Sequence, residues 1–205
     1  MKFNPKFNYP KSIRAYYNGK RIYDVNDQKL PSVTTILSAT QPAEKRESLQ
    51  RWRDRVGAAA AEKITREATN RGSAMHDFLE KFCLGKLNLD LLGDNSLERQ
   101  MADQIIENGL RNKVSEIYGV EATLFYPNKY AGAADLICNY EGKNSIIDFK
   151  NSSQLRKDEW NTDYYLQLSA YQMAHNKVYG TDIDQGVILV CTKAVSYTHL
   201  TLPTT

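Results

Sequence analysis

An acid and a lysine end an apolar run in the stretch NSIIDFKNS at positions 144–152. Asp148 and Lys150 are two residues apart, so in an extended strand their side chains point to the same face. The acid-x-lysine pattern occurs three times in the chain, but DQK at 27–29 and EGK at 141–143 lie in polar turns, where charged residues are common. Taken alone, Asp148 and Lys150 are most simply interpreted as a salt-bridged strand end.

A second acid in the preceding apolar segment, AGAADLIC, changes this interpretation. If strands at 131–140 and 145–150 pair as a hairpin around the turn EGKN, Asp135 and Asp148 meet at one edge of the sheet. Two carboxylates in a poorly solvated place repel each other, and a divalent cation relieves that repulsion. Oxygen ligands select Mg²⁺ or Mn²⁺, and the backbone carbonyl of Phe149 could supply a third oxygen.

The residue types around this acid pair suit hydrolysis of a phosphodiester. Beside a cation, and partly buried, the Lys150 ammonium should have a lowered pKa, so that it can orient or deprotonate an attacking water. His76 is a candidate nitrogen ligand and shares a helix face with Glu80, one turn away. A solitary histidine is, however, more often a surface residue or a satisfied core residue.

Further polar residues could contact DNA or support the metal ligands. Gln167 and Tyr171 are four residues apart in YYLQLSAYQ, and an amide and a phenol on one helix face can hold a phosphate or a flipped nucleotide. An amphipathic helix with polar edges explains the same pair without any ligand. Glu121 could be a further acid near the metal or a residue at the rim of the site. We assign Glu80 and Arg71 to this supporting group as well.

Helical periodicity dominates the first half of the chain. It covers EKRESLQRWRDRVG, interrupted at Gly57, and then two further stretches, AAAAEKITREAT and RGSAMHDFLEKFCLG. Before them, Pro31 and the β-branched run 33–36 favour strand or loop over helix. After a loop at 88–95, Asn95 and Glu98 resemble a capping pair that opens a helix reaching to about Tyr118.

Strand patterns dominate the second half and indicate one α/β (α+β) domain with a small mixed central sheet, flanked by helices and preceded by N-terminal helical additions. After the hairpin we expect a polar loop at 151–161. The remaining predicted elements are a strand at 120–126, the helix DYYLQLSAYQMAHNKVYG closed by Gly180, and the buried strand GVILVCTK. We place an N-terminal arm at 1–22, the domain at 23–193 and a tail at 194–205. The tail resembles a translated sequencing-adapter remnant, so we expect it to be non-native and the natural carboxyl end to be missing.

The composition limits the class of protein. The chain of 205 residues is 41% apolar and 25% charged, which is typical of a soluble globular protein, and no apolar run approaches a membrane span. The amino terminus lacks a secretory signal, so an intracellular protein is expected. Cys83, Cys138 and Cys191 form no CxxC pair, which argues against a zinc knuckle or an iron–sulfur cluster and favours free buried thiols.

The N-terminal arm is basic and aromatic. Residues 1–21 carry six Lys or Arg residues and no acid, with Phe3, Phe7, Tyr9, Tyr16 and Tyr17 interleaved. Cations beside stacking rings suit single-stranded nucleic acid. The alternative is a loosely packed arm whose rings dock on the core.

Four segments in order, RGSAMH, GAAD, IIDFK and QLSAY, resemble the PD-(D/E)xK nucleases of the RecB-type exonuclease branch. With LPSVTTIL and WRDRVG, the likeness is strongest to the genome-maintenance exonuclease group, also found in phages, and it covers about residues 20–193. It implies a restriction-endonuclease-like core in which His76, Asp135 and Asp148 ligate Mg²⁺ or Mn²⁺ and Lys150 positions the water. Gln167 and Tyr171 match the element associated with DNA contacts.

The resulting expectation is a metal-dependent DNA exonuclease that acts on single strands or frayed ends in recombination, repair or replication, in a bacterial or phage-infected cytoplasm. Replication or recombination proteins would be its partners. Three alternatives stay open: a structure-specific endonuclease with the same site, a catalytically silent nucleic-acid-binding module, and a structural metal-binding domain.

Overall fold

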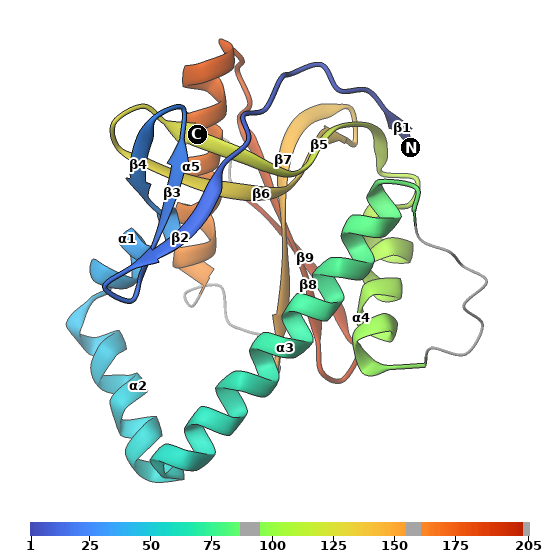
Figure 1. The fold of residues 1–205 in the computed structure, drawn as a ribbon. Helices are drawn as coiled ribbons and strands as arrows, with labels where there is room; N and C mark the ends of the chain where they lie inside the picture. The colour runs from blue at the N-terminus through green and yellow to red at the C-terminus, as the bar shows by residue number, and fades with distance from the viewer. Residues whose placement is uncertain (87–94, 155–160, 203–205) are drawn as a thin grey trace.

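A six-stranded mixed sheet forms the centre of the computed structural model, which describes residues 1–86, 95–154 and 161–202 (Figure 1). The strand order is β1-β5-β6-β7-β8-β9, with β6 antiparallel to both of its neighbours, β5 and β7, and with β8 parallel to β7. The strands are β1 (Lys2–Phe3), β5 (Val114–Tyr126), β6 (Tyr130–Tyr140), β7 (Lys143–Ser152), β8 (Gln185–Thr192) and β9 (Tyr197–Thr201).

Helices cover both faces of this sheet, as the sequence predicted. On one face pack α3 (Ala58–Cys83) and α4 (Leu97–Ile105), which bury Met75, Leu79, Met101 and Ile105 completely against the strands. On the other face lies α5 (Thr162–Tyr179), which connects β7 to β8 and ends at Gly180 in a left-handed cap. The arrangement is consistent with a restriction-endonuclease-like core (Figure 1).

The predicted hairpin between β6 and β7 is confirmed. Glu141 and Gly142 form its two-residue turn with φ angles of 50° and 86°, which is the positive-φ pair that a tight hairpin turn requires. The register pairs Leu136 with Ile147. Asp135 and Asp148 are the next residues along, so they leave the paired region opposite each other.

A small second sheet precedes the helices and consists of β2 (Ile13–Tyr17), β3 (Lys20–Val25) and β4 (Gln28–Pro31). The expectation of strand or loop at 33–36 is wrong, because these residues belong to α1 (Val33–Ala39). The Ser32 hydroxyl accepts a hydrogen bond from the Thr35 N–H group and caps the helix, while Val33 is buried against the α5 side of the sheet. Capping and packing here outweigh the β-propensity of the run.

The helical region differs from the prediction in two places. The two stretches expected after Gly57 are one continuous helix, α3, and the kink before it lies at Gly57 (φ 85°), where α2 (Ala43–Val56) joins in an open V (Figure 1). The helix expected from Asn95 to about Tyr118 is capped by Ser96 instead and ends at Ile105.

A single π-helical turn, η1 (Ile106–Leu110), follows α4, and β5 begins at Val114. The apolar residues near the end of the expected helix therefore alternate along a strand. The apolar spacing of a short segment fits both periods, and pairing with β6 decides between them.

Both predicted polar loops lie largely at 87–94 and 155–160, outside the described residues, although Asn151 and Ser152 extend β7. The segment at 197–201, part of the tail that we expected to be non-native, pairs antiparallel with β8 as β9. Cys83, Cys138 and Cys191 are free and buried, as predicted. Among the described residues, no helix is long and apolar enough to cross a membrane.

Candidate active site

The two aspartates lie side by side at the end of the β6–β7 pairing. The Phe149 N–H group donates a 2.6 Å hydrogen bond to Asp135 Oδ2, which holds the Asp135 side chain across the strand gap. The side chains of Asp135 and Asp148 are only 11% and 4% exposed. Burial raises the pKa of Asp135 to about 6, with His76 opposing and Asp148 reinforcing the shift. This is the poorly solvated carboxylate pair that the sequence predicted.

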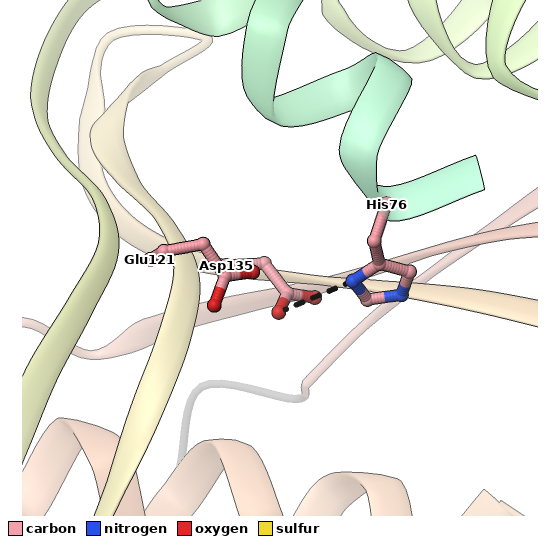
Figure 2. Close-up of side chains that lie close together, drawn as sticks. All are labelled: His76, Glu121 and Asp135. Atoms are coloured by element: carbon pink, nitrogen blue, oxygen red, sulfur yellow. Dashed lines mark ion pairs between the residues drawn. The ribbon is translucent and has the colours of Figure 1, made fainter. Parts of the chain in front are cut away.

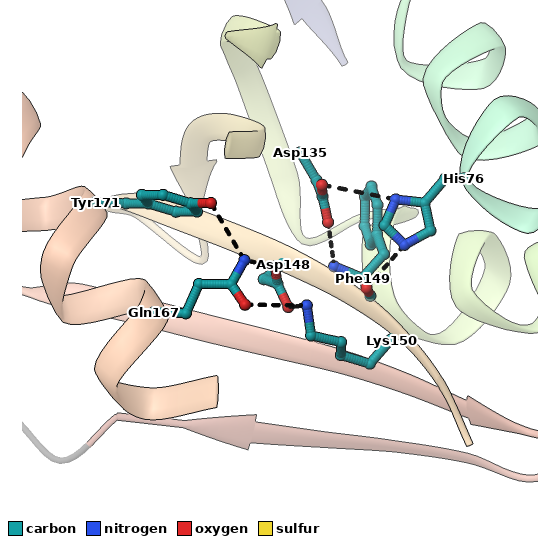
Figure 3. A network of polar contacts seen from close by, with 7 residues as sticks. All are labelled: His76, Asp135, Asp148, Phe149, Lys150, Gln167 and Tyr171. Atoms are coloured by element: carbon teal, nitrogen blue, oxygen red, sulfur yellow. Dashed lines mark hydrogen bonds and ion pairs between the residues drawn. The ribbon is translucent and has the colours of Figure 1, made fainter. Parts of the chain in front are cut away.

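His76 reaches the same place from α3. Met75 and Leu79 anchor that helix in the core, so His76 faces the edge of the sheet. Its Nε2 atom lies 2.9 Å from the Phe149 carbonyl oxygen, and its Nδ1 atom lies 3.6 Å from Asp135 Oδ1 (Figure 3). When the His76 ring is neutral and its Nε2–H group donates to the Phe149 carbonyl, the lone pair of Nδ1 faces the Asp135 carboxylate. A proton or a metal ion between these two atoms satisfies both.

Lys150, Gln167 and Tyr171 form a network around the other aspartate (Figure 3). The Lys150 ammonium forms an ion pair with Asp148 Oδ2 and donates to Gln167 Oε1 at 3.4 Å. The Gln167 amide donates to Asp148 Oδ1 at 3.1 Å and to the Tyr171 hydroxyl at 3.3 Å. The helix face predicted from the four-residue spacing is therefore real and is turned toward the acids.

The expected fall in the pKa of Lys150 applies to the protein with a cation bound beside the lysine, and it stays a prediction. Burial lowers this pKa, but the charges of Asp148 and Asp135 outweigh burial and raise it above its ordinary value. The ammonium is consequently the cation that balances the buried acid pair.

Glu121 joins His76 and Asp135 in a cluster that could hold a metal ion (Figure 2). One ligand atom from each residue lies within 4.8 Å of the other two. Glu121 occupies β5 opposite Asp135, at a φ of 47° that non-glycine residues seldom adopt. Partial desolvation and the charge of Asp135 raise the pKa of Glu121 to about 7. The unusual backbone turns the Glu121 carboxyl group toward the acid pair.

A cavity of about 530 Å³ opens over these residues. His76, Asp135, Asp148, Lys150, Gln167 and Tyr171 line its floor. Arg14 and Arg21 from the second sheet also line it, and sequence reasoning had counted them only among the charges of the arm. In the sequence, Arg14 and Arg21 each stand two residues before a tyrosine, which is a strand-like spacing that could have indicated a shared face. Only the pairing of β2 with β3 places both arginines over the acids.

Two predicted supporting residues lie outside the cavity over the acids, although Glu80 is close enough to Glu121 for its charge to add to the rise in the pKa of that residue. Glu80 lines a neighbouring cavity of about 730 Å³ between the arm and β5, one helical turn from His76. Arg71 lies on α3 with its Nε–H group buried, and it is not among the residues that line the cavity over the acids. Neither residue forms part of the His76, Glu121 and Asp135 cluster.

The fold and the site together define a mixed α/β protein with a carboxylate, histidine and lysine centre at the end of a strand hairpin. The chain is 32% identical over 181 residues to mitochondrial genome maintenance exonuclease 1 of Mus musculus, and 27% and 28% identical to the proteins of that name from Homo sapiens and Xenopus tropicalis. Each match covers 83% of this chain, and the chain spans about half the length of these relatives. No protein-family model matches the chain. The similarity supports a relationship to an exonuclease family.

Proposed function

We propose that this protein is a metal-dependent DNA exonuclease of the PD-(D/E)xK type, acting on single strands or frayed ends. The observation that carries the proposal is the juxtaposition of a buried aspartate pair, a histidine and a lysine, bridged by the amide of Gln167. Similarity to proteins named genome maintenance exonuclease supports the reaction class and DNA as the substrate.

The donor set fits a divalent cation. Ligands on opposite sides of one Mg²⁺ ion are about 4.2 Å apart, close to the 4.8 Å within which the cluster of His76, Glu121 and Asp135 falls. The Phe149 carbonyl, predicted from the sequence as a ligand, accepts instead from His76 Nε2 at 2.9 Å, on the side of the ring away from Nδ1, and so fixes the ring orientation. We assign His76, Asp135 and Asp148 as ligands, with Glu121 as a further acid of the ligand set. When bound, Mg²⁺ or Mn²⁺ supplies charge stabilisation on the phosphate oxygens.

Lys150, Gln167 and Tyr171 orient the water molecule and hold the site together. Lys150 donates from its ammonium toward Asp148 and Gln167 and lies where it can orient a water molecule at the cavity floor. Gln167 holds both Lys150 and Asp148, so the two charges keep a fixed relation. Tyr171 supports Gln167 and packs its ring against Gly132, where a side chain would collide with it. The site is thus held from α5 as well as from the strands.

The test is digestion of end-labelled single-stranded DNA with Mg²⁺, with EDTA, and with the variant Lys150→Ala. We expect metal-dependent release of nucleotides from the linear strand and a loss of at least about 100-fold in the variant, the usual contribution of a proton-handling group. Lys177→Ala, on the opposite end of α5, is the matched control and should retain full activity.

A closed circular strand separates exonuclease from endonuclease activity. Cutting of the circle at the rate of the linear strand would replace the exonuclease proposal by an endonuclease with the same site. Binding of DNA without any product, by protein whose circular dichroism spectrum is that of a folded chain, would leave a silent binding module.

A further inference from the structure

The N-terminal arm divides into two parts with different surroundings. In the first part, Phe7 and Tyr9 pack their rings against His175 and Tyr179 of α5, with centroid distances of 4.7 Å from Phe7 to His175 and 5.3 Å from Tyr9 to Tyr179. These rings dock on the core, which is the plainer of the two interpretations of the arm. They are not available to stack on nucleic-acid bases.

The second part, the β2–β3 hairpin, exposes its rings. Tyr16 and Tyr17 are 65% and 68% exposed. As neighbours in a strand they point to opposite faces. Arg14 lies on the Tyr16 face, and Arg21 is the partner of Tyr16 across the hairpin. One face of the hairpin therefore carries an exposed ring between two guanidinium groups.

This face borders a groove that continues from the cavity over the acids. A hollow of about 320 Å³, lined by Tyr16, Lys20 and Arg21 together with residues of α1, lies next to that cavity. The two spaces share Arg21 and Thr34 as lining residues. Because the two spaces adjoin at Arg21, a DNA strand with a phosphate at the acids would reach Tyr16 by passing Arg21.

The charges along this route complement a phosphate backbone. Among the described residues, Arg14, Lys20 and Arg21 form no ion pair with a carboxylate. Arg21 donates to the Tyr16 hydroxyl at 3.3 Å, and its Nε–H group is buried with no partner in the described part of the chain. An arginine that lines the groove without a carboxylate partner, beside an exposed ring, is suited to grip a phosphate while the ring stacks on the adjoining base.

We propose that the groove between the β2–β3 hairpin and α1 is a nucleotide-binding subsite for single-stranded DNA, with Arg21 holding a phosphate and Tyr16 stacking on a base. This inference rests on the proposed nuclease function and adds the direction in which the strand leaves the acids. The occupant is a single strand because an exposed ring can stack only on a base that is not paired within a duplex.

Binding is measured in a Lys150→Ala background, so that the DNA is not degraded, by fluorescence anisotropy of a 5′-fluorescein 12-mer of thymidine. Tyr16→Ala should weaken binding about 5- to 150-fold, the range observed when a stacking ring is removed. Tyr16→Phe keeps the ring and should stay within about threefold. Tyr17→Ala, equally exposed on the opposite face, is the matched control and should leave affinity unchanged.

The phosphate contact has its own readout. Arg21→Gln should reduce the slope of log affinity against log salt concentration by about 0.7, the value for one phosphate contact on a single strand. Lys29→Gln in β4, an exposed cation of the same small sheet that lines neither cavity, should leave the slope unchanged. Equal effects of the Tyr16 and Tyr17 variants, or an unchanged slope for Arg21→Gln, would overturn the subsite.

Failure of the subsite is distinguishable from failure of the nuclease function. Hydrolysis of thymidine 5′-p-nitrophenyl phosphate reports on the acids without needing the groove, so the rate of the wild-type protein on this ester tests the nuclease site alone. Absence of hydrolysis of both this ester and DNA by the wild-type protein would refute the proposed function, whereas the anisotropy comparison would still decide whether the groove binds a single strand.

Discussion

Replacement of His175 by glutamine should make this protein less sensitive to acid. His175 is fully buried in α5, where its Nδ1–H group donates to the Thr181 hydroxyl at 2.7 Å. That hydroxyl in turn donates to the side chain of Asn176, so it accepts from the histidine. The Nε2 atom, 3.1 Å from the Tyr9 hydroxyl, then accepts as a neutral nitrogen. The surroundings favour uncharged imidazole.

The size of this acid destabilisation follows from the pKa of His175. Burial lowers the pKa of His175 from 6.5 to about 4. Between these values the unfolded chain binds a proton that the folded chain does not, so the free energy of unfolding falls as the pH drops from about 6.5 to about 4. A difference of 2.5 pK units corresponds to about 3 kcal/mol. Because His175 contacts Phe7 and Tyr9, acid should first release the N-terminal segment of the arm.

Urea unfolding between pH 4 and 7.5, followed by circular dichroism, measures this effect. Wild-type protein should lose about 3 kcal/mol more than His175→Gln over that interval, with His199→Gln, an exposed histidine, behaving like the wild type. The comparison with the variants removes the contribution of the carboxylates, which titrate in all three proteins. Parallel curves for wild type and His175→Gln would refute the assignment of a buried neutral imidazole.

Two further predictions concern the site. A Cβ atom at Gly132 would lie 2.6 Å from the Tyr171 ring, so Gly132→Ala should lower the free energy of unfolding by about 1–3 kcal/mol, measured by urea denaturation. In a double variant with Tyr171→Ala, the two losses of free energy should be strongly non-additive. Simple additivity of the two losses would contradict the collision. Glu121→Gln should weaken Mn²⁺ binding at least about tenfold in calorimetric titration. Glu62→Gln, an exposed acid near the start of α3, should not weaken it, and equal affinities for both variants would remove Glu121 from the ligand set.

The prediction of the β6–β7 hairpin was correct because the residues of its turn and of the two flanking segments determine it locally. The turn around Gly142 needs positive φ at two residues, and apolar segments on either side of a short polar turn are typical of paired strands. The helix of Gln167 and Tyr171 succeeded for a similar reason, because Gly180 ends it in a left-handed cap and the four-residue spacing defines one face. These features depend on neighbours in the chain.

Predictions failed where distant contacts choose between local alternatives. The run 33–36 has a strand composition, but the Ser32 cap and the burial of Val33 make it helical. The segment after Ile105 fits either period until β6 pairs with it. Likewise the tail at 197–201 has weak periodicity of its own, and the open edge of β8 turns it into a strand.

The sequence by itself determined the chemical types of the candidate site: the acids Asp135 and Asp148, Lys150 two residues on, and the amide and phenol of α5. It also predicted the hairpin that brings both acids to neighbouring strands, whereas the register that sets Asp135 opposite Asp148 follows from the two-residue turn found in the structure. Only the tertiary structure decided which charges neutralise one another. Lys150 pairs with Asp148, while Glu121 and His76 gather on Asp135, because these contacts join residues from different elements and depend on how the helices pack on the sheet.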